Sequence, residues 1–421
     1  MEGTMSRGPL DGMKVVELAH IMAGPACGMM LADMGADVVK VEKPAGDDSR
    51  RFVPPRVEGE SAAYLMMNRN KRGIALNLKD RDGVEALRRL LAEADVVIEN
   101  YRMGTMEKLG LGYEALRKIN PRLVYCEISG FGRTGPYASR GGFDLIAQGM
   151  SGLMSITGEG PGRPPVKPGA PITDITAGIL GAMGCAAAYA HAQATGEGQR
   201  VDTSLFEAGI TLTYWQSAIA FATGQAPGPL GSAHPLNAPY QAFRTRDGWI
   251  NVGAANQANW LRLLDVIGAP ELDDDPRFGS NHDRMVNLDA LVTVLSEHLE
   301  TRETADWLTR MEAAGLPAGP VLTITEMHAD PQAQARDMIV TTDHPAAGAV
   351  KSIGLPVKFS ATPGVIDRPA PRLGEHGREI LAEIGYGGAE IDQMLAGGAL
   401  VIEEGLETAD PRPRREARGA T

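Results

Sequence analysis

One aspartate, Asp174, stands where the chain could present a carboxylate nucleophile. It follows Pro171 and Thr173 and precedes a stretch rich in glycine and alanine, 178–192, which predicts a closely packed internal helix. We expect Thr173 or Asp174 to cap the start of that helix. Because a helix N-terminus stabilises negative charge, the carboxylate is expected to be ionised. An ionised carboxylate in a fixed place can attack an activated acyl group, although most aspartates at such positions only cap their helix.

The segment 68–79 gathers four cations in an otherwise acidic chain. They are Arg69, Lys71, Arg72 and Lys79. Arginine offers phosphate oxygens a planar fork of donors and lysine offers a point charge, so the cluster suits a phosphate-bearing ligand. A solvated basic face on a surface loop would give the same pattern, and charge alone favours that simpler interpretation.

Several common catalytic signatures are missing from the sequence. The first strand-to-helix turn, 23–28, lacks the G-x-G-x-x-G pattern, which argues against a nicotinamide dinucleotide. The sequence has neither the P-loop pattern nor G-x-S-x-G, which argues against a P-loop enzyme and an ordinary esterase. The eight histidines never fall within five residues of one another, so no H-x-x-x-H pair of metal ligands can form on a helix and a structural zinc is not expected.

The elements that would position these residues alternate between strand and helix. Strand patterns at 13–19, 38–42, 96–99 and 123–128 are separated by helical patterns, and strands joined by crossover helices form a parallel sheet. The sequence therefore predicts an α/β fold with a doubly wound, Rossmann-like large domain. Polar residues follow three of its strands, at 42–44, 99–102 and 129–132, where open α/β sheets bind ligands.

The organisation of the chain changes after about residue 205. We predict the N-terminal part of the large domain over 1–205 and, because prolines and glycines gather in 222–239, a linker over 206–239. A smaller α+β domain is expected over 240–330, beginning with a hairpin whose turn is Arg246-Asp247-Gly248. Residues 331–405 would return to the large domain, and 406–421 would form a flexible tail.

Composition narrows the partners and the compartment. The 421 residues carry a net charge of −12, which repels nucleic acid and anionic membrane surfaces, so we expect neither as a partner. The apolar stretch 178–192 is shorter than the roughly 18 to 20 residues of a membrane span. Three widely separated cysteines give no disulfide framework, and residues 1–10 show no targeting pattern, so a cytoplasmic protein is expected.

Several segments, in the same order along residues 10–400, resemble family III CoA-transferases. This group contains formyl-CoA transferase, succinyl-CoA:dicarboxylate transferases and α-methylacyl-CoA racemase. The matching segments are Gly24-Pro25, Val38 to Asp47, Asn68 to Arg72, Glu99 to Tyr101, Gly130 to Pro136, Phe143 to Gly152, the surroundings of Asp174, and Leu373 to His376.

The resemblance implies CoA transfer from an acyl-CoA to a free carboxylic acid, with Asp174 as the nucleophile. Asp174 would attack the thioester to give a mixed anhydride and CoA thiolate, and the thiolate would return to form an aspartyl-CoA thioester. The acceptor carboxylate would attack that thioester, and the thiolate would cleave the second anhydride to release the new acyl-CoA. The CoA thioester is thus a substrate, and the resemblance implies no permanently bound cofactor and no metal.

The resemblance also implies a set of CoA contacts. Lys43 corresponds to a cation near the nucleotide phosphate, and Lys108 to an arginine of formyl-CoA transferase. Arg102 and Arg140 are added from their placement, and either could instead form a surface salt bridge. The remaining assigned contacts are Leu76 and Lys79 beside the adenosine, Asn100 and Tyr101 beside the diphosphate and pantetheine, Met22 and Ala23 facing the acyl group, and Phe143.

Departures from the family pattern bear on the substrate. Met22 in place of glutamine disfavours formate and oxalate, while the stretch 231–243 is similar to succinyl-CoA:glutarate and related transferases. His234 could receive a distal carboxylate in an acceptor pocket that also includes Asp144, although a loop histidine without such a task is an equal alternative. Phe143 stands where the racemase branch needs a histidine base, and phenylalanine cannot accept a proton.

CoA transfer between succinyl-CoA and a dicarboxylic acid is the expected function, and two alternatives remain. They are a 2-methylacyl-CoA racemase or epimerase, and a non-catalytic CoA-binding protein. The resemblance further implies an interlocked homodimer, with sites between the large domain of one subunit and the small domain of the other.

Overall fold

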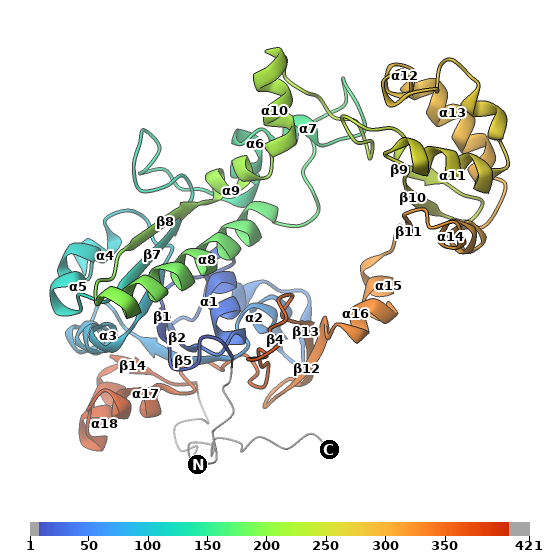
Figure 1. The fold of residues 1–421 in the computed structure, drawn as a ribbon. Coiled ribbons are helices and arrows are strands. Elements are labelled where there is room, and N and C mark those ends of the chain that lie inside the picture. The colour runs from blue at the N-terminus through green and yellow to red at the C-terminus, as the bar shows by residue number, and fades with distance from the viewer. Residues whose placement is uncertain (1–7, 404–421) are drawn as a thin grey trace. The chain divides into compact units, whose positions relative to one another are not determined.

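The computed structural model describes residues 8–403 and divides the chain into two compact units (Figure 1). Unit 1 contains the residues up to 151, residues 169–212 and those from 334 onward, and unit 2 contains residues 152–168 and 213–333. The predicted tail, 406–421, lies outside the described residues.

The predicted linker over 206–239 is wrong in its first half. Residues Leu205–Thr211 form helix α9 and Tyr214–Thr223 form helix α10. Ser204 caps α9 by accepting a hydrogen bond from the N–H of Glu207, and the prolines that suggested a linker begin only at Pro227. The small unit is also larger than the predicted 240–330, because 152–168 and 213–239 belong to it.

Unit 1 is built on a seven-stranded sheet in the order β14-β5-β2-β1-β6-β7-β8. All neighbouring strands are parallel except β14 and β5. The strand order runs outward in both directions from the neighbours β1 and β6, as in a doubly wound Rossmann-like sheet, so the predicted fold of unit 1 is confirmed. The strands are β1 (Lys14–Glu17), β2 (Asp37–Glu42), β5 (Lys71–Leu76), β6 (Val96–Glu99), β7 (Val124–Ser129), β8 (Arg200–Ser204) and β14 (Leu400–Val401).

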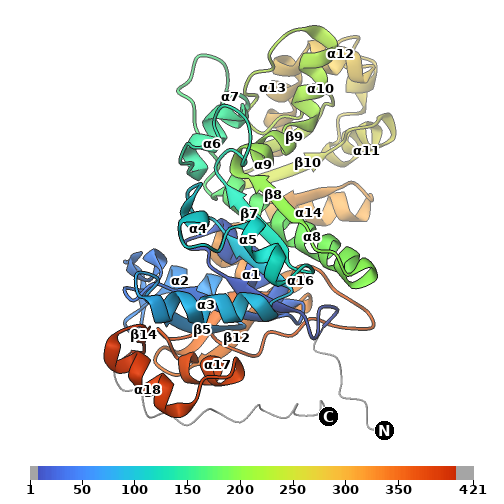
Figure 2. The same cartoon turned by 90° about the vertical axis from the view of Figure 1, so that its left-hand side faces the viewer.

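Helices cover both faces of this sheet, which explains why its central strands are continuous apolar runs. Figure 1 shows α1 (Ala23–Asp33) and α8 (Ile172–Thr195) side by side on one face. Figure 2 looks onto the other face, where α3 (Arg81–Glu93) and α5 (Tyr113–Ile119) lie. The two C-terminal helices, α17 (Gly377–Glu383) and α18 (Gly388–Gly397), pack into that second core as well.

Helix α8 is the predicted internal helix, but it is longer than its glycine and alanine stretch. Its 24 residues are enough, by length and composition alone, to cross a membrane. The helix instead packs along α1, β7 and β8 within unit 1. It approaches α1 closely at Gly178, where a Cβ atom would lie 2.8 Å from the carbonyl oxygen of Ala23 and 2.7 Å from the Cβ of Ala26.

The three cysteines, far apart in the sequence, meet in the core beneath α1 and α8. Cys27, Cys126 and Cys185 are fully buried free thiols whose sulfur atoms lie within 4.8 Å of one another. Among residues 8–403 they are the one group of three or more such side chains placed closely enough to hold a metal ion. Thiols packed in this way also serve as small apolar core residues.

Shorter elements complete unit 1. They are η1 (Asp48–Arg51), β3 (Arg56–Val57), β4 (Glu60–Ser61), α2 (Ala62–Met67), α4 (Thr105–Lys108), α6 (Asp144–Met150), β12 (Ile339–His344) and β13 (Gly348–Ile353), while α16 (Pro331–Ala335) leads the chain back from unit 2.

Unit 2 combines a small antiparallel sheet with helices, as expected for an α+β domain. β9 (Tyr240–Arg244) and β10 (Trp249–Gly253) form the predicted hairpin, and β11 (Ala318–Pro320) pairs with β10. The core includes the buried rings of Trp260 and Trp307. The other elements are α7 (Leu153–Ile156), α11 (Gln257–Ile267), η2 (Pro270–Asp273), α12 (Asn281–Val286), α13 (Leu288–Leu299), α14 (Thr304–Ala313) and α15 (Ile324–Ala329).

We predict that Gly178→Ala destabilises the protein by about 1–3 kcal/mol, because the new methyl group would push α8 away from the backbone of α1. Urea unfolding followed by circular dichroism measures this. Gly397→Ala is the matched control, since Gly397 is also helical but a Cβ atom there meets no atom within 4 Å. The control is expected to unfold at the same or a higher urea concentration, and equal losses in both variants would contradict the packing argument.

Candidate active site

The segments that follow β1 and β6 meet where the strand order reverses, which is where open α/β sheets bind ligands. Asn100 joins the two segments. Its side-chain oxygen accepts a hydrogen bond from the N–H of His20 at 3.0 Å, and its amide nitrogen donates to the carbonyl of His20 at 2.9 Å. The rings of His20 and Tyr101 lie beside each other, with centroids 5.9 Å apart.

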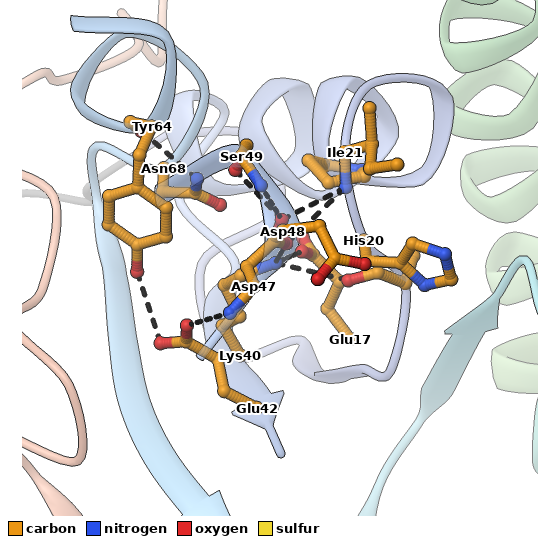
Figure 3. A network of polar contacts seen from close by, with 12 residues as sticks. Glu17, His20, Ile21, Lys40, Glu42, Asp47, Asp48, Ser49, Tyr64 and Asn68 are labelled. Carbon is orange, nitrogen blue, oxygen red and sulfur yellow. Dashed lines mark hydrogen bonds and ion pairs between the residues drawn. The ribbon is translucent and has the colours of Figure 1, made fainter. Parts of the chain in front are cut away.

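Four charged side chains are buried beside the segment that joins β1 to α1, where they bind the backbone of Ala19, Ile21 and Pro25. Figure 3 shows Glu17, Lys40 and Asp47 among them. Lys40 is 3.0 Å from Glu17 and 2.8 Å from Asp47, and Lys71 is 2.7 Å from the other oxygen of Glu17. We call Glu17, Lys40, Asp47 and Lys71 the buried charge cluster. Two cations and two carboxylates balance one another, as buried charges must.

The pairing within the cluster shifts the pKa of its members. Burial alone would raise the pKa of Asp47, but Lys40 and the donors of Ser49 hold it well below its usual range. Burial opposes the charge of Lys40, yet Glu17 and Asp47 raise the pKa of Lys40 above its usual value. Burial lowers the pKa of Lys71 to about 8 against the attraction of Glu17. Asp47 and Lys40 are therefore charged at neutral pH.

The predicted phosphate-binding role of segment 68–79 is wrong for three of its four cations. Arg69 is buried 2.6 Å from Asp33, Lys71 belongs to the buried charge cluster, and Arg72 pairs with Asp37 at 2.6 Å. Arg72 also contacts Glu379 and Glu383 of α17. The alternative of a solvated basic face fails for these three as well, because all three side chains are buried and paired with carboxylates. Lys79 is exposed.

Asp174 is the third residue of α8, inside its first turn, so neither Thr173 nor Asp174 is the cap. The start of the helix is held by Asp144 of α6. Its Oδ1 accepts hydrogen bonds from the N–H of Thr173 at 3.0 Å and from the hydroxyl of Thr173 at 2.8 Å. Gln148 donates to Oδ2 of Asp144 at 2.7 Å. These contacts show that Asp144 holds the start of α8, and its place in an acceptor pocket stays a prediction.

The pKa of Asp174 differs from the sequence-based expectation. Burial raises it, and the neighbouring Asp144 carboxylate raises it further, to about 6. These two effects outweigh the helix N-terminus, which was expected to keep the carboxylate ionised. A more basic carboxylate is a better nucleophile, but only its ionised fraction can attack.

Helix packing brings Asp174 to the start of α1. Gly178 lies one helical turn after Asp174 and touches Ala23 and Ala26. One turn of an α-helix spans about 5.4 Å, so the first turns of α8 and α1 are neighbours. Met22 is half-buried and Ala23 is buried at the start of α1, the helix that packs against α8 one turn beyond Asp174.

The other predicted CoA contacts fall into three groups. Leu76 is fully buried and pairs with Leu400, so its side chain is a core residue and that assignment is wrong for the side chain. Both the oxygen and the nitrogen of the Asn100 amide are hydrogen-bonded to the backbone of His20. Burial raises the pKa of Tyr101 to about 12, so its phenol is neutral. The remaining side chains are exposed; these are Lys43, Lys79, Arg102, Lys108, Arg140 and Phe143. Lys43 pairs with Asp48 at 2.7 Å, and Arg140 stacks on the ring of Tyr137.

His234, the other residue assigned to the acceptor pocket, lies in unit 2 between two aromatic rings. The ring centroid of Tyr240 is 5.2 Å away and that of Trp215 is 6.5 Å away, both in edge-on contact. Its Nδ1 accepts a hydrogen bond from the N–H of Leu236 at 3.1 Å. A neutral ring bonded in this way carries its proton on Nε2, where it can serve as a donor.

Sequence reasoning missed the buried charge cluster and the capping role of Asp144. A signal was present for the cluster, because Glu17 ends β1 and Lys40 lies inside β2, each next to buried valines. The cap carried no such signal, since Asp144 and Thr173 are far apart in the sequence.

Comparisons with known proteins agree on one family. Residues 10–377 match the family model described as CoA-transferase family III. The chain is 43% identical over 383 residues to the succinate–glutarate CoA-transferase of Agrobacterium fabrum, covering 89% of this chain and 96% of that protein. It is 40% identical over 380 residues to the acetyl-CoA:oxalate CoA-transferase of Acetobacter aceti, covering 90% and 96%. A crystal structure of a CAIB/BAIF family protein from Brucella suis matches with a TM-score of 0.81 and 42% identity, covering 90% of this chain and all of that one.

We predict that Asp174→Asn stabilises the protein at about pH 8 and leaves its stability unchanged at about pH 4. A carboxyl whose pKa rises on folding from 3.8 to about 6 destabilises the folded state once it is ionised, by up to about 3 kcal/mol above pH 6. The neutral asparagine removes that penalty. Urea unfolding of both proteins across this pH range gives the difference.

Glu85→Gln is the control of opposite sign in the same unit. Hydrogen bonds from Arg88, and then from Arg89, lower the pKa of Glu85 to about 2. The control variant should therefore lose stability at neutral pH and recover it in acid. An Asp174→Asn protein less stable than the wild type at about pH 8 would show that the Asp174 carboxylate is not desolvated.

Proposed function

The chain belongs to CoA-transferase family III, and from that premise we propose that it transfers CoA from succinyl-CoA to a dicarboxylic acid through covalent intermediates on Asp174. That the protein is an enzyme moving CoA between acyl-CoA and carboxylic acids follows from its relatives. The donor, the acceptor and the intermediates are the proposal.

One observation carries the proposal: Asp174 is a partly buried carboxylate of raised pKa at the start of α8, beside the first turn of α1. In the first step its oxygen attacks the thioester carbonyl, the C–S bond breaks, and CoA leaves as a thiolate. The product is an anhydride between Asp174 and the donor acyl group. Thiolate attack on the aspartyl carbonyl then gives the aspartyl-CoA thioester and releases the donor acid. Burial protects both intermediates from hydrolysis.

The acceptor acid then reverses this sequence. Its carboxylate attacks the aspartyl-CoA thioester and expels the thiolate, which attacks the acceptor carbonyl of the new anhydride. Asp144 has two tasks in this cycle: it fixes the first turn of α8 and it keeps Asp174 basic. The exposed cations Lys43, Lys79 and Lys108 supply charge that suits the phosphates of CoA.

A dicarboxylic acceptor is supported by the glutarate transferase among the relatives. Identity alone does not separate acceptors, because an oxalate transferase is nearly as similar as the glutarate one. Racemisation gains no support, because Phe143 is apolar and 72% exposed at the place where a base would be needed.

We also propose that the enzyme is a homodimer in a reducing compartment, the cytoplasm. Helix α10 contains no buried residue, and its Tyr214, Trp215 and Phe221 are 73%, 63% and 89% exposed, as interface residues are before association. Three neighbouring free thiols suit a reducing compartment.

Asp174→Ala is predicted to abolish CoA transfer from succinyl-CoA to glutarate, because no other residue takes over the covalent step. Mass spectrometry of wild-type enzyme incubated with succinyl-CoA should show a CoA adduct on Asp174. Borohydride or hydroxylamine should trap it. An Asp174→Ala protein that keeps transferase activity would refute the covalent mechanism, and so would an adduct on another residue.

The rate of adduct formation should fall in acid with an apparent pKa near 6, because only ionised Asp174 attacks. Asp144→Asn removes the neighbouring charge and should move this limb to lower pH, while slowing the reaction above it. Both proteins meet the same substrate, so a difference between their profiles reports on the enzyme. Coincident acid limbs would mean that Asp144 does not tune Asp174.

A further inference from the structure

The turn between β1 and α1 has a backbone conformation that its own sequence disfavours. Ile21 has φ of 68°, in the left-handed region that β-branched residues rarely adopt. Such conformations persist only where the surroundings enforce them, and they gather at functional sites. Ile21 directly precedes Met22 and Ala23, which open α1.

The conformation of Ile21 is enforced by Asp47, as Figure 3 shows. Both carboxylate oxygens of Asp47 accept from the N–H of Ile21, at 3.2 and 3.3 Å. Asp47 is itself fixed by Lys40, by the N–H and hydroxyl of Ser49 at 2.8 Å each, and by Glu42, which accepts from the N–H of Asp47 at 2.8 Å. The carboxylate therefore has little freedom to follow a moving turn.

The same cluster also holds the chain on either side of Ile21. Lys40 donates to the carbonyl of Ala19 at 3.0 Å, and Lys71 donates to the carbonyl of Pro25 at 3.0 Å. Backbone groups before, at and after the turn are thus bound by buried charged side chains. Asp47 is the member that binds the strained residue.

We propose that Asp47 is a positioning residue for CoA transfer, holding Ile21 in its left-handed conformation so that Met22 and Ala23 meet the reacting acyl group beside Asp174. This inference rests on the proposed function, which places the acyl group there. Ile21 is linked to Asp174 over a short distance. It lies two residues before Ala23, which packs against Gly178, and Gly178 is one turn along α8 from Asp174. A displacement of about 1 Å in such a site can slow a reaction about a hundredfold.

The test compares loss of Asp47 with its rescue at Ile21. Asp47→Ala is expected to lower kcat by about tenfold to a hundredfold, with KM for succinyl-CoA changed by less than about threefold. Adding Ile21→Gly should restore much of the lost kcat, because glycine adopts positive φ unaided. Ile21→Gly alone supplies the baseline. If Asp47→Ala does not fold, Asp47→Asn with and without Ile21→Gly is expected to show a smaller loss and the same rescue.

Asp33→Ala is the matched control. Asp33 ends α1, is buried, and pairs with Arg69 at 2.6 Å, so its loss removes one buried negative charge from a paired cation, as the loss of Asp47 does, but at the other end of the helix. It should lower the unfolding temperature as Asp47→Ala does while keeping kcat within about threefold of the wild type. Equal falls of kcat in both variants, or no rescue by Ile21→Gly, would make Asp47 a purely structural residue and overturn the proposal.

Amide hydrogen exchange separates this proposal from the proposed function. Exchange across residues 18–24 should quicken in Asp47→Ala but not in Asp33→Ala. Faster exchange in Asp47→Ala together with a wild-type enzyme that transfers no CoA would refute the function and leave the clamp on Ile21 standing. Normal transfer and unchanged kcat in Asp47→Ala would refute the positioning role.

Discussion

Four charges buried with a net charge of zero are the constraint on which unit 1 depends. Each of Glu17, Lys40, Asp47 and Lys71 is at most 3% exposed, and an unpaired charge at such a place would cost several kcal/mol. The strands β1, β2 and β5 bring three of them into one layer, and the segment after β2 adds the fourth. Lys40, Asp47 and Lys71 also form hydrogen bonds with the backbone around the start of α1. The conformation of that turn therefore depends on the same side chains that neutralise one another.

The neighbouring carboxylates of Asp144 and Asp174 have the opposite effect on a pKa. The charge cluster lowers the pKa of Asp47, whereas burial and Asp144 raise the pKa of Asp174. Burial and the Asp144 carboxylate both disfavour the ionised form of Asp174, while Asp144 accepts hydrogen bonds from Thr173 and Gln148. The same carboxylate that fixes the start of α8 raises the pKa of Asp174, the nucleophile of the proposed mechanism. The ionised form of Asp174 costs stability, and in that mechanism the cost is offset by a more basic carboxylate.

The sequence predicted the fold of unit 1 and singled out Asp174, but it did not show which charged side chains pair with one another or which residues surround Asp174. Buried parallel strands are short apolar runs in the sequence, so the alternation of strands and helices could be predicted from local patterns. Arg69, Lys71 and Arg72 looked like a phosphate site because their partners, Asp33, Glu17 and Asp37, lie more than thirty residues away. The burial of Leu76 and the hydrogen bonds of Asp144 to Thr173 could not be predicted either, because nothing local shows which side chain is buried or already bonded.

By itself the sequence determined the alternation of strand and helix, the family and the aspartate at the start of α8, because each is written in local patterns or ordered motifs. Tertiary structure alone decided which charges neutralise one another, that Asp144 raises the pKa of Asp174, and that Asp47 holds Ile21. Those properties depend on distances and burial between segments remote in sequence. Electrostatic energy changes steeply with both, and neither can be read from residue types and spacing.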